Sequence, residues 1–166
     1  RIDATQCLFD DSPIHIVAEI ARRARAAATA RSIYIAGENE PQHGELARPP
    51  EQGGMGLDAL WNDDFHHSAM VAATGASEAY YSETRGTPQE LISALKWGFL
   101  YQGQYYAWQK KRRGHPSLDL PSTAFIQFLQ NHDQVANSAR GQRLHQLTSP
   151  GRWRALTALL LLAPGT

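Results

Sequence analysis

The sequence predicts an α/β fold built on a parallel sheet. Short apolar runs alternate with amphipathic segments along the 166 residues, which is the pattern of repeated strand–helix units. Polar residues follow several of the apolar runs directly, as they do at the carboxyl ends of parallel strands. The chain is 42% hydrophobic, enough to bury a core, and its length suits one domain. We therefore expect residues 1–166 to lie in a single domain, with no second one.

Each element of the first half has a local signal. Ser12 and Pro13 predict the N-cap and first residue of a helix that ends near Arg31, with Glu19 on its solvent side. After it the sequence predicts a strand at residues 32–36 and a loop rich in Pro and Gly at residues 41–56. A weaker strand at residues 57–61 and a short helix at residues 65–73 follow.

The second half opens with a strong helix signal. Thr87 and Glu90 form a capping box before apolar residues at helical spacing. The remaining elements are a long aromatic and basic loop at residues 101–121 and the clearest strand at residues 124–129. A helix at residues 149–162 starts at Ser149–Pro150.

Composition excludes several function classes. Sixteen basic residues balance sixteen acidic ones, so nothing indicates a nucleic-acid partner, and the run Lys110–Arg113 predicts a solvated loop or a platform for a sugar chain. The longest apolar run, residues 158–164, is too short to span a membrane. The single Cys7 rules out an internal disulfide and is compatible with a reducing compartment, so we expect a cytoplasmic protein.

Three carboxylates lie where predicted strands end: Asp3, Glu38 and Asp133. Each alone is more often a helix cap or a solvated side chain. Together at one rim, they suit glycosidic bond cleavage, in which one carboxylate attacks the anomeric carbon and one carboxylic acid protonates the leaving oxygen. Crowding and partial burial raise the pKa of the acid, so that it holds its proton near neutrality.

Three segments carry a resemblance to a known family. Arg1-Ile2-Asp3-Ala4, Ile35-Ala36-Gly37-Glu38-Asn39 and the segment Phe128–Gln134 resemble, in order, the fourth-, fifth- and seventh-strand segments of the alpha-amylase family of glycoside hydrolases. The resemblance implies a partial (β/α)8 TIM barrel from about the end of strand 4 through helix 7. A complete barrel takes about 250 residues, so we expect a piece of a longer protein.

A finer resemblance is to the malto-oligosyltrehalose trehalohydrolase branch of that family, through residues 56–67, 99–105 and 128–144. It implies hydrolysis, with retention, of the α-1,4 bond next to the trehalose end of malto-oligosyltrehalose or a related α-glucan. One alternative is a glucan branching enzyme or another transglycosylase of the family. An alternative of another class is a non-catalytic carbohydrate-binding or structural barrel fragment.

The resemblance also implies roles for single residues. Asp3 is the nucleophile, Glu38 the acid and then the base, and Asp133 stabilises the distorted sugar. Glu40 stays open as a competing acid, since it lies two positions after Glu38. Arg1 holds Asp3 ionised.

Further residues are candidates for substrate binding. The resemblance implies sugar contacts for His132 and its neighbours Asn131 and Gln134. Trp61, Asp63 and Asp64 either line the cleft or serve packing and helix capping, and we hold these alternatives even.

No cofactor or metal is expected. His66 and His67 are adjacent and point apart, and no further clustered ligand completes a zinc site with them. An incomplete barrel exposes strand edges and apolar faces, so we expect the isolated piece to be inactive and to associate with itself, or to be part of a larger protein.

Overall fold

The predicted α/β architecture is confirmed by a computed structural model, which describes residues 1–165. Its parallel sheet has the strand order β1 (Ala36–Gly37), β2 (Ala59–Trp61) and β5 (Phe125–Ile126). Ile2 adds a parallel bridge to Gly37 on the open side of β1. Four chain segments therefore lie side by side in sequence order and run in one direction, so the residues that follow them meet at one edge.

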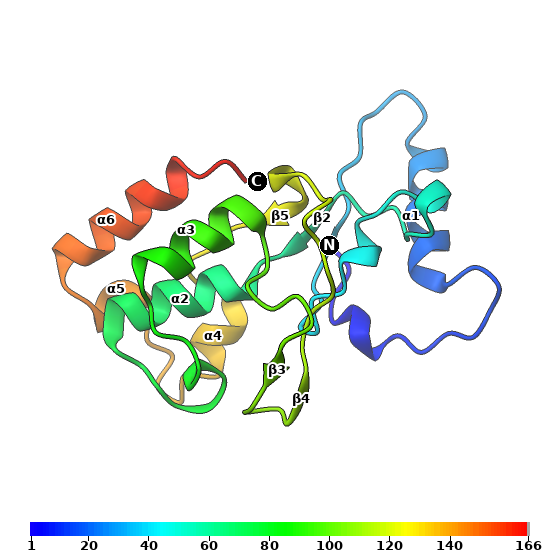
Figure 1. The fold of residues 1–166 in the computed structure, drawn as a ribbon. Helices are drawn as coiled ribbons and strands as arrows, with labels where there is room; N and C mark the ends of the chain where they lie inside the picture. The colour runs from blue at the N-terminus through cyan, green and yellow to red at the C-terminus, as the bar shows by residue number, and fades with distance from the viewer. Residues whose placement is uncertain (166) are drawn as a thin grey trace.

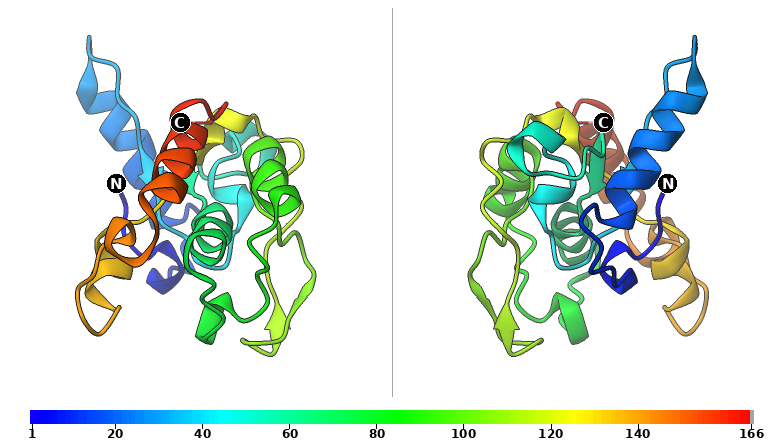
Figure 2. Two further views of the ribbon diagram at one scale, coloured as in Figure 1. Left: turned by 90° about the vertical axis from the view of Figure 1, so that its left-hand side faces the viewer. Right: turned by 90° about the vertical axis from the view of Figure 1, so that its right-hand side faces the viewer.

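Helices join and flank these strands (Figure 1). Between Ile2 and β1 runs α1 (Ile16–Ala28), and α2 (Asp63–Thr74) and α3 (Pro88–Trp97) lie between β2 and β5. After β5 come α4 (His132–Ala136), α5 (Leu144–Leu147) and α6 (Pro150–Leu161). Figure 2 shows α1 projecting away from the group formed by α2, α3 and α6. No helix within residues 1–165 has both the length and the apolar character needed to cross a bilayer.

The core has two parts. The first part joins α1 to the sheet, and its buried members include Val17, Ala21, Ile35, Leu60, Phe99 and Phe125. The second part joins α2 and α3 to α6, and its buried members include Phe65, Ala69, Leu95, Leu129, Leu144 and Leu156. In the first part, the backbone at Gly98 lies close to the ring of Phe125. Gly98 has φ of +80°, and a Cβ there would lie 2.3 Å from the Phe125 ring. Only glycine combines this conformation with this space.

Several predicted boundaries are wrong. The first helix begins at Ile16 rather than at Pro13, because the Asp10 carboxylate accepts hydrogen bonds from the backbone N–H groups of Ser12 and Ile16 and folds the intervening residues into a turn. The ring of His15 caps the helix instead, with its Nδ1 3.2 Å from the backbone N of Val17. The predicted strand 124–129 pairs only over β5, and the predicted strand 32–36 gives way to β1.

The loop predicted at residues 101–121 contains an antiparallel hairpin, with β3 (Tyr105–Tyr106) paired to β4 (Lys111–Arg112). The expectation that its basic run is solvated is wrong for Arg113, which is 2% exposed. Its guanidinium lies 3.4 Å from the Glu40 carboxylate and 3.7 Å from that of Asp64. These two carboxylates, and the Tyr106 ring whose centroid lies 5.0 Å from the guanidinium carbon, offset part of the cost of burying the charge.

Candidate active site

A cavity of about 380 Å³ opens where the parallel strands end. Its walls come from the segments after β1, β2 and β5 together with the hairpin and the turn before α3. The lining residues are Gln6, Glu38, Glu40, Asp63, His67, Tyr80, Trp108, Gln109, Asn131, Asp133, Gln134 and Asn137. Half of these residues are outside the set predicted from the sequence motifs. His67 and Asn137 follow Asp63 and Asp133 by one helical turn, whereas Tyr80, Trp108 and Gln109 reach the cavity through long-range folding.

Arg1 joins the two carboxylates expected to react. Its Nη1 donates hydrogen bonds to Asp3 and to Glu38, which follow neighbouring β-segments. The guanidinium carbon lies 4.6 Å from the centroid of the Trp61 ring, an arrangement that favours a cation over an aromatic face. Of the two alternatives left open for Trp61, cleft lining or packing, the contact with Arg1 favours packing, and the lining of the cavity includes Glu38 but not Trp61, Arg1 or Asp3.

The backbone around Glu38 is fixed without its side chain. Its N–H donates to the carbonyl of Ile2 at 2.9 Å, which extends the parallel pairing by one step. Its carbonyl accepts from the N–H of Thr5 at 2.9 Å and from the Thr5 hydroxyl at 2.8 Å. The Asn39 amide, itself buried, donates to the same hydroxyl at 2.9 Å. These contacts hold the carboxyl group at the rim.

The pKa values of Asp3 and Glu38 are shifted in opposite directions. The pKa of Asp3 lies below its usual range because Asp3 is hydrogen-bonded to Glu38 and to Arg1. The pKa of Glu38 is raised, first by burial and then by the hydrogen bond and charge of Asp3 and the charge of Asp133. The Asp3 side chain is 70% exposed and that of Glu38 only 20%, which explains why burial acts on Glu38. The pKa values of these two neighbouring carboxyl groups are therefore pushed apart, with that of Asp3 lowered and that of Glu38 raised.

Asp133, Asn131 and Gln134 lie at the first turn of α4, facing the cavity. The Asn131 side chain caps the helix by accepting from the N–H of Asp133 at 2.9 Å, and the Gln134 side chain accepts from the N–H of Asn131 at 2.8 Å. This capping box occupies the side-chain oxygens of Asn131 and Gln134 and fixes the start of α4. His132 lies 3.3 Å from the Asp133 carboxylate and stacks edge-on against Trp61, outside the lining set.

Asp63 and Asp64 have separate environments. Asp63 lines the cavity, and burial together with the nearby acidic groups raises its pKa to about 7. Asp64 is 2% exposed, and its carboxylate accepts from the backbone N–H groups of Leu100 and Tyr101 at 2.7 and 3.1 Å. The structure therefore brings Asp63 to the cavity and does not bring Asp64 there.

Glu40 also lines the cavity, but its side chain is engaged elsewhere. It accepts a hydrogen bond from the Gln109 amide at 2.9 Å and faces Arg113 at 3.4 Å. Both partners belong to the hairpin segment, so Glu40 links that segment to the end of β1. Glu38, which shares Arg1 with Asp3, has the surroundings that suit an acid next to a nucleophile.

The adjacent histidines of α2 are buried. His66 lies 2.7 Å from the carbonyl of Leu129 through Nδ1 and 3.1 Å from the Tyr81 hydroxyl through Nε2, so both ring nitrogens are occupied. Burial lowers its pKa to about 4, and lowers that of His67 as well. His67 stacks on Tyr80, and both rings line the cavity. A different group, made of His43, Glu45 and His115, brings three possible metal ligands together outside the cavity.

Curated proteins named malto-oligosyltrehalose trehalohydrolase match the chain along nearly all of its length. The one from Saccharolobus solfataricus is 34% identical over 164 residues, covering 99% of this chain and 28% of the relative. The one from Deinococcus radiodurans is 36% identical over 167 residues, covering 97% of this chain and 26% of the relative. The Mycobacterium tuberculosis protein is 32% identical over 171 residues, with 100% and 29% covered.

No family model matches the chain. Its structure is similar to the crystal structure of a Salmonella typhimurium protein with a provisional alpha-amylase assignment, with a TM-score of 0.89 and 40% identity over 98% of this chain and 28% of that one. The chain thus spans little more than a quarter of the length of the relatives that it matches. The resemblance expected from the sequence is confirmed: along nearly its whole length the chain is similar to hydrolases named malto-oligosyltrehalose trehalohydrolase, and its α/β structure is similar to part of an alpha-amylase-like protein.

Proposed function

We propose that this chain is the catalytic portion of one (β/α)8 barrel domain, from the end of strand 4 through helix 7, in a retaining glycoside hydrolase that releases trehalose from malto-oligosyltrehalose. One observation carries the proposal. Arg1 contacts both Asp3 and Glu38, while the pKa of Asp3 is lowered and that of Glu38 is raised. Two neighbouring carboxyl groups with pKa values pushed apart are the pair that acid–nucleophile chemistry needs.

The first chemical step uses both groups at once. The Asp3 carboxylate attacks the anomeric carbon and forms an ester, while Glu38 gives its proton to the departing glycosidic oxygen. Arg1 keeps Asp3 ionised before the attack through a charge-assisted hydrogen bond. Asp133, which lines the same cavity as Glu38, accepts hydrogen bonds from the hydroxyls of the flattened sugar ring.

The second step reverses the roles. Glu38, now ionised, takes a proton from water as the water oxygen attacks the anomeric carbon, and the ester bond to Asp3 breaks. The carboxylate of Asp3 and the acid form of Glu38 are restored. Attack by a sugar hydroxyl instead of water gives transglycosylation, and the same residues serve both outcomes.

The surface supports a substrate longer than one sugar. A second hollow of about 640 Å³ shares Tyr80, Gln134 and Asn137 with the cavity that contains Glu38. Trp108, 48% exposed, lines the cavity and lies edge-on to Tyr80, with ring centroids 6.0 Å apart. Exposed aromatic faces bind the apolar faces of sugar rings. We assign these two adjoining hollows to the glucan chain and its trehalose end.

Trehalose release tests the proposal. The longest natural chain that contains these residues is incubated with malto-oligosyltrehalose, and free trehalose and branched products are measured by chromatography. We expect trehalose from the unchanged protein and none from Asp3→Asn. Branched products without trehalose would establish a transferase, and unchanged trehalose release by Asp3→Asn would overturn the assignment of Asp3.

The barrel assignment has its own support in exposed apolar side chains. Phe9 is 93% exposed, and Leu161 and Leu162 are 78% and 85% exposed. Monomeric proteins seldom leave such groups uncovered in clusters, so we propose that further barrel elements cover them in the parent protein and that the isolated piece self-associates. Sedimentation of a monomeric, fully active 166-residue chain would contradict this. The cytoplasmic location stays a prediction.

A further inference from the structure

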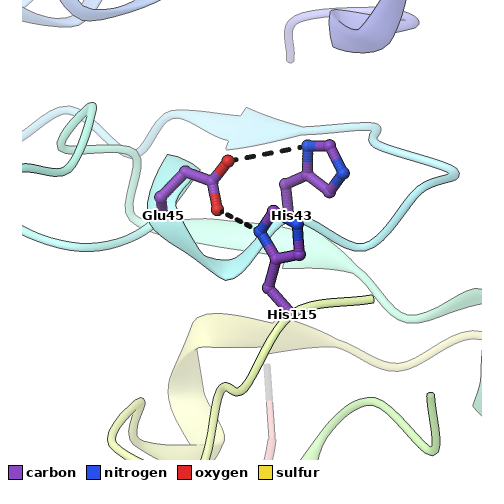
Figure 3. A group of neighbouring side chains, drawn as sticks. All are labelled: His43, Glu45 and His115. Carbon is purple, nitrogen blue, oxygen red and sulfur yellow. Dashed lines mark hydrogen bonds and ion pairs between the residues drawn. The ribbon is translucent and has the colours of Figure 1, made fainter. Parts of the chain in front are cut away.

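A cluster of three polar side chains lies outside the proposed active site, where two loops cross. His43 and Glu45 flank Gly44 at the start of a short 3-10 turn (Gly44–Leu46), and His115 comes from the segment after the hairpin (Figure 3). The Glu45 carboxylate lies 2.8 Å from Nδ1 of His115 and 3.6 Å from Nδ1 of His43. One oxygen faces each ring, so three potential ligand atoms converge.

The backbone beneath the cluster is fixed by other contacts. The N–H groups of Gly114 and His115 donate to the carbonyls of Pro41 and Gln42 at 2.9 and 3.2 Å. The N–H of His43 donates to the Asn39 side chain at 2.8 Å. The loops also pack closely: a Cβ on Gly44 would lie 3.3 Å from that of Ser117. The three side chains therefore project from a scaffold that holds them together without help from an ion.

We propose that His43, Glu45 and His115 bind a divalent transition-metal ion of the zinc class. Two imidazoles and a carboxylate are a donor set that zinc accepts, and three protein ligands leave a fourth position for water. The three ligand atoms lie within 4.8 Å of one another. Tetrahedral zinc with bonds of about 2.0–2.1 Å needs them about 3.4 Å apart, so small side-chain rotations complete the site.

Ring orientation shows which rotation is needed. The imidazoles of His43 and His115 are stacked, with centroids 4.2 Å apart and planes 6° from parallel. The nitrogen lone pair lies in the plane of its ring, so parallel rings must tilt towards each other to bind one ion. The His115 side chain is 49% exposed, so a rotation about its χ2 angle has to break only its contacts with Glu45 and His43. Metal binding therefore breaks the ring stack.

The ion would cross-link two distant parts of the chain near the cavity wall. Glu45 and His115 are 70 residues apart. Glu40 and Arg113, which pair with each other, lie a few residues from these ligands on the same two segments. Since an ion bound only by the folded chain stabilises that fold, zinc should hold the hairpin segment against the end of β1.

The test is a titration of metal-free protein with zinc chloride by calorimetry, on the longest natural chain that contains these residues. We expect one zinc ion whose affinity falls at least tenfold in His43→Ala, His115→Ala and Glu45→Gln. His145→Ala is the matched control, because His145 is an exposed histidine outside the cluster, and its affinity should be unchanged. Cobalt chloride gives a second readout, since a tetrahedral site produces strong visible absorption that the same variants should lose.

The opposite results are equally clear. Equal zinc affinity in the unchanged protein and the three cluster variants, or no zinc binding by the unchanged protein, would overturn the proposal. Far-UV circular dichroism of each variant in chelator checks that it folds, and Glu45→Gln, which keeps the shape of the side chain, serves if an alanine variant does not. Trehalose release is not the readout, so failure of this site and failure of the proposed reaction are distinguishable.

Discussion

Glu38→Gln removes the proposed acid while leaving its surroundings in place. Glutamine has the size of glutamate but has no acidic proton to give. The backbone contacts of residue 38, to Ile2 and Thr5, do not involve its side chain and should survive. The variant therefore tests proton transfer rather than folding, and an unchanged circular dichroism spectrum and melting temperature would verify this.

The size of the effect depends on how much the substrate needs the proton. General acid–base catalysis contributes about 10²–10⁴-fold, or about 3–5.5 kcal/mol of barrier at about 1.4 kcal/mol per tenfold change in rate. We expect trehalose release from malto-oligosyltrehalose to fall by that range. With fluoride as leaving group, the first step needs little protonation, so the rate of ester formation should fall far less.

Glu40→Gln is the discriminating control, because Glu40 lines the same cavity and is the competing acid. Its carboxylate is held by Gln109 and Arg113, so we expect a loss below tenfold and no dependence on the leaving group. A larger loss in Glu40→Gln than in Glu38→Gln would transfer the acid role to Glu40. Glu38→Gln activity within tenfold of the unchanged protein would refute the reasoning outright.

Two further changes probe the charge of the site and the packing of the core. In Arg1→Met, the pKa values of Asp3 and Glu38 both rise, since the cation that lowers each is gone. In the pH profile of kcat/KM, ionisation of Asp3 sets the acid limb and loss of the Glu38 proton sets the alkaline limb. Both limbs should move to higher pH, and an unmoved profile would contradict the contact of Arg1 with both carboxyl groups. Gly98→Ala should lower the free energy of unfolding by about 1–3 kcal/mol more than Gly75→Ala, because both have positive φ but only the first meets a ring. Urea titration measures both, and equal losses would refute the packing argument.

Helix starts were predictable where local chemistry acts alone. The capping box of Thr87 and Glu90 forms as expected, and Ser149 caps the helix that starts at Pro150. Ser12 fails as a helix start because the Asp10 carboxylate accepts from the N–H of Ile16, which in a helix capped by Ser12 would donate to the Ser12 carbonyl. Neighbouring side chains compete to accept hydrogen bonds from the backbone N–H groups at a helix start. Which of them succeeds depends on the conformation of the turn, and the residue types alone do not specify that conformation.

The hairpin formed by β3 and β4 carries no sequence signal. Its connection, Ala107–Lys110, lacks the Asn-Gly or Asp-Gly pair typical of tight hairpins, and Lys110 adopts a φ of +55°. The burial of Arg113 is equally non-local, since its acidic partners precede it by 73 and 49 positions in the chain. The sequence of a basic run predicts solvated side chains, and it does not show that the fold places acidic partners beside Arg113.

The candidate site was partly predictable for a topological reason. Parallel strands in sequence order bring the residues after each strand to one edge, so carboxylates that follow apolar runs meet there. Which of the adjacent residues Asp63 and Asp64 faces the cavity was not predictable, because it depends on backbone N–H groups 36 and 37 residues after Asp64. Tyr80 and Gln109 enter the lining from segments without a motif.

The different roles of Asp3 and Glu38 do not come from Arg1, because Arg1 contacts both and lowers the pKa of both. Exposure separates them: solvent reaches most of the Asp3 side chain, whereas Glu38 is largely covered and faces a second charge from Asp133. A cation shared by two carboxyl groups therefore draws them together, and unequal burial decides which of the two pKa values is raised. It follows that a change which hydrates Glu38, while leaving Arg1 in place, should bring the two pKa values closer together and lower the rate of the first chemical step.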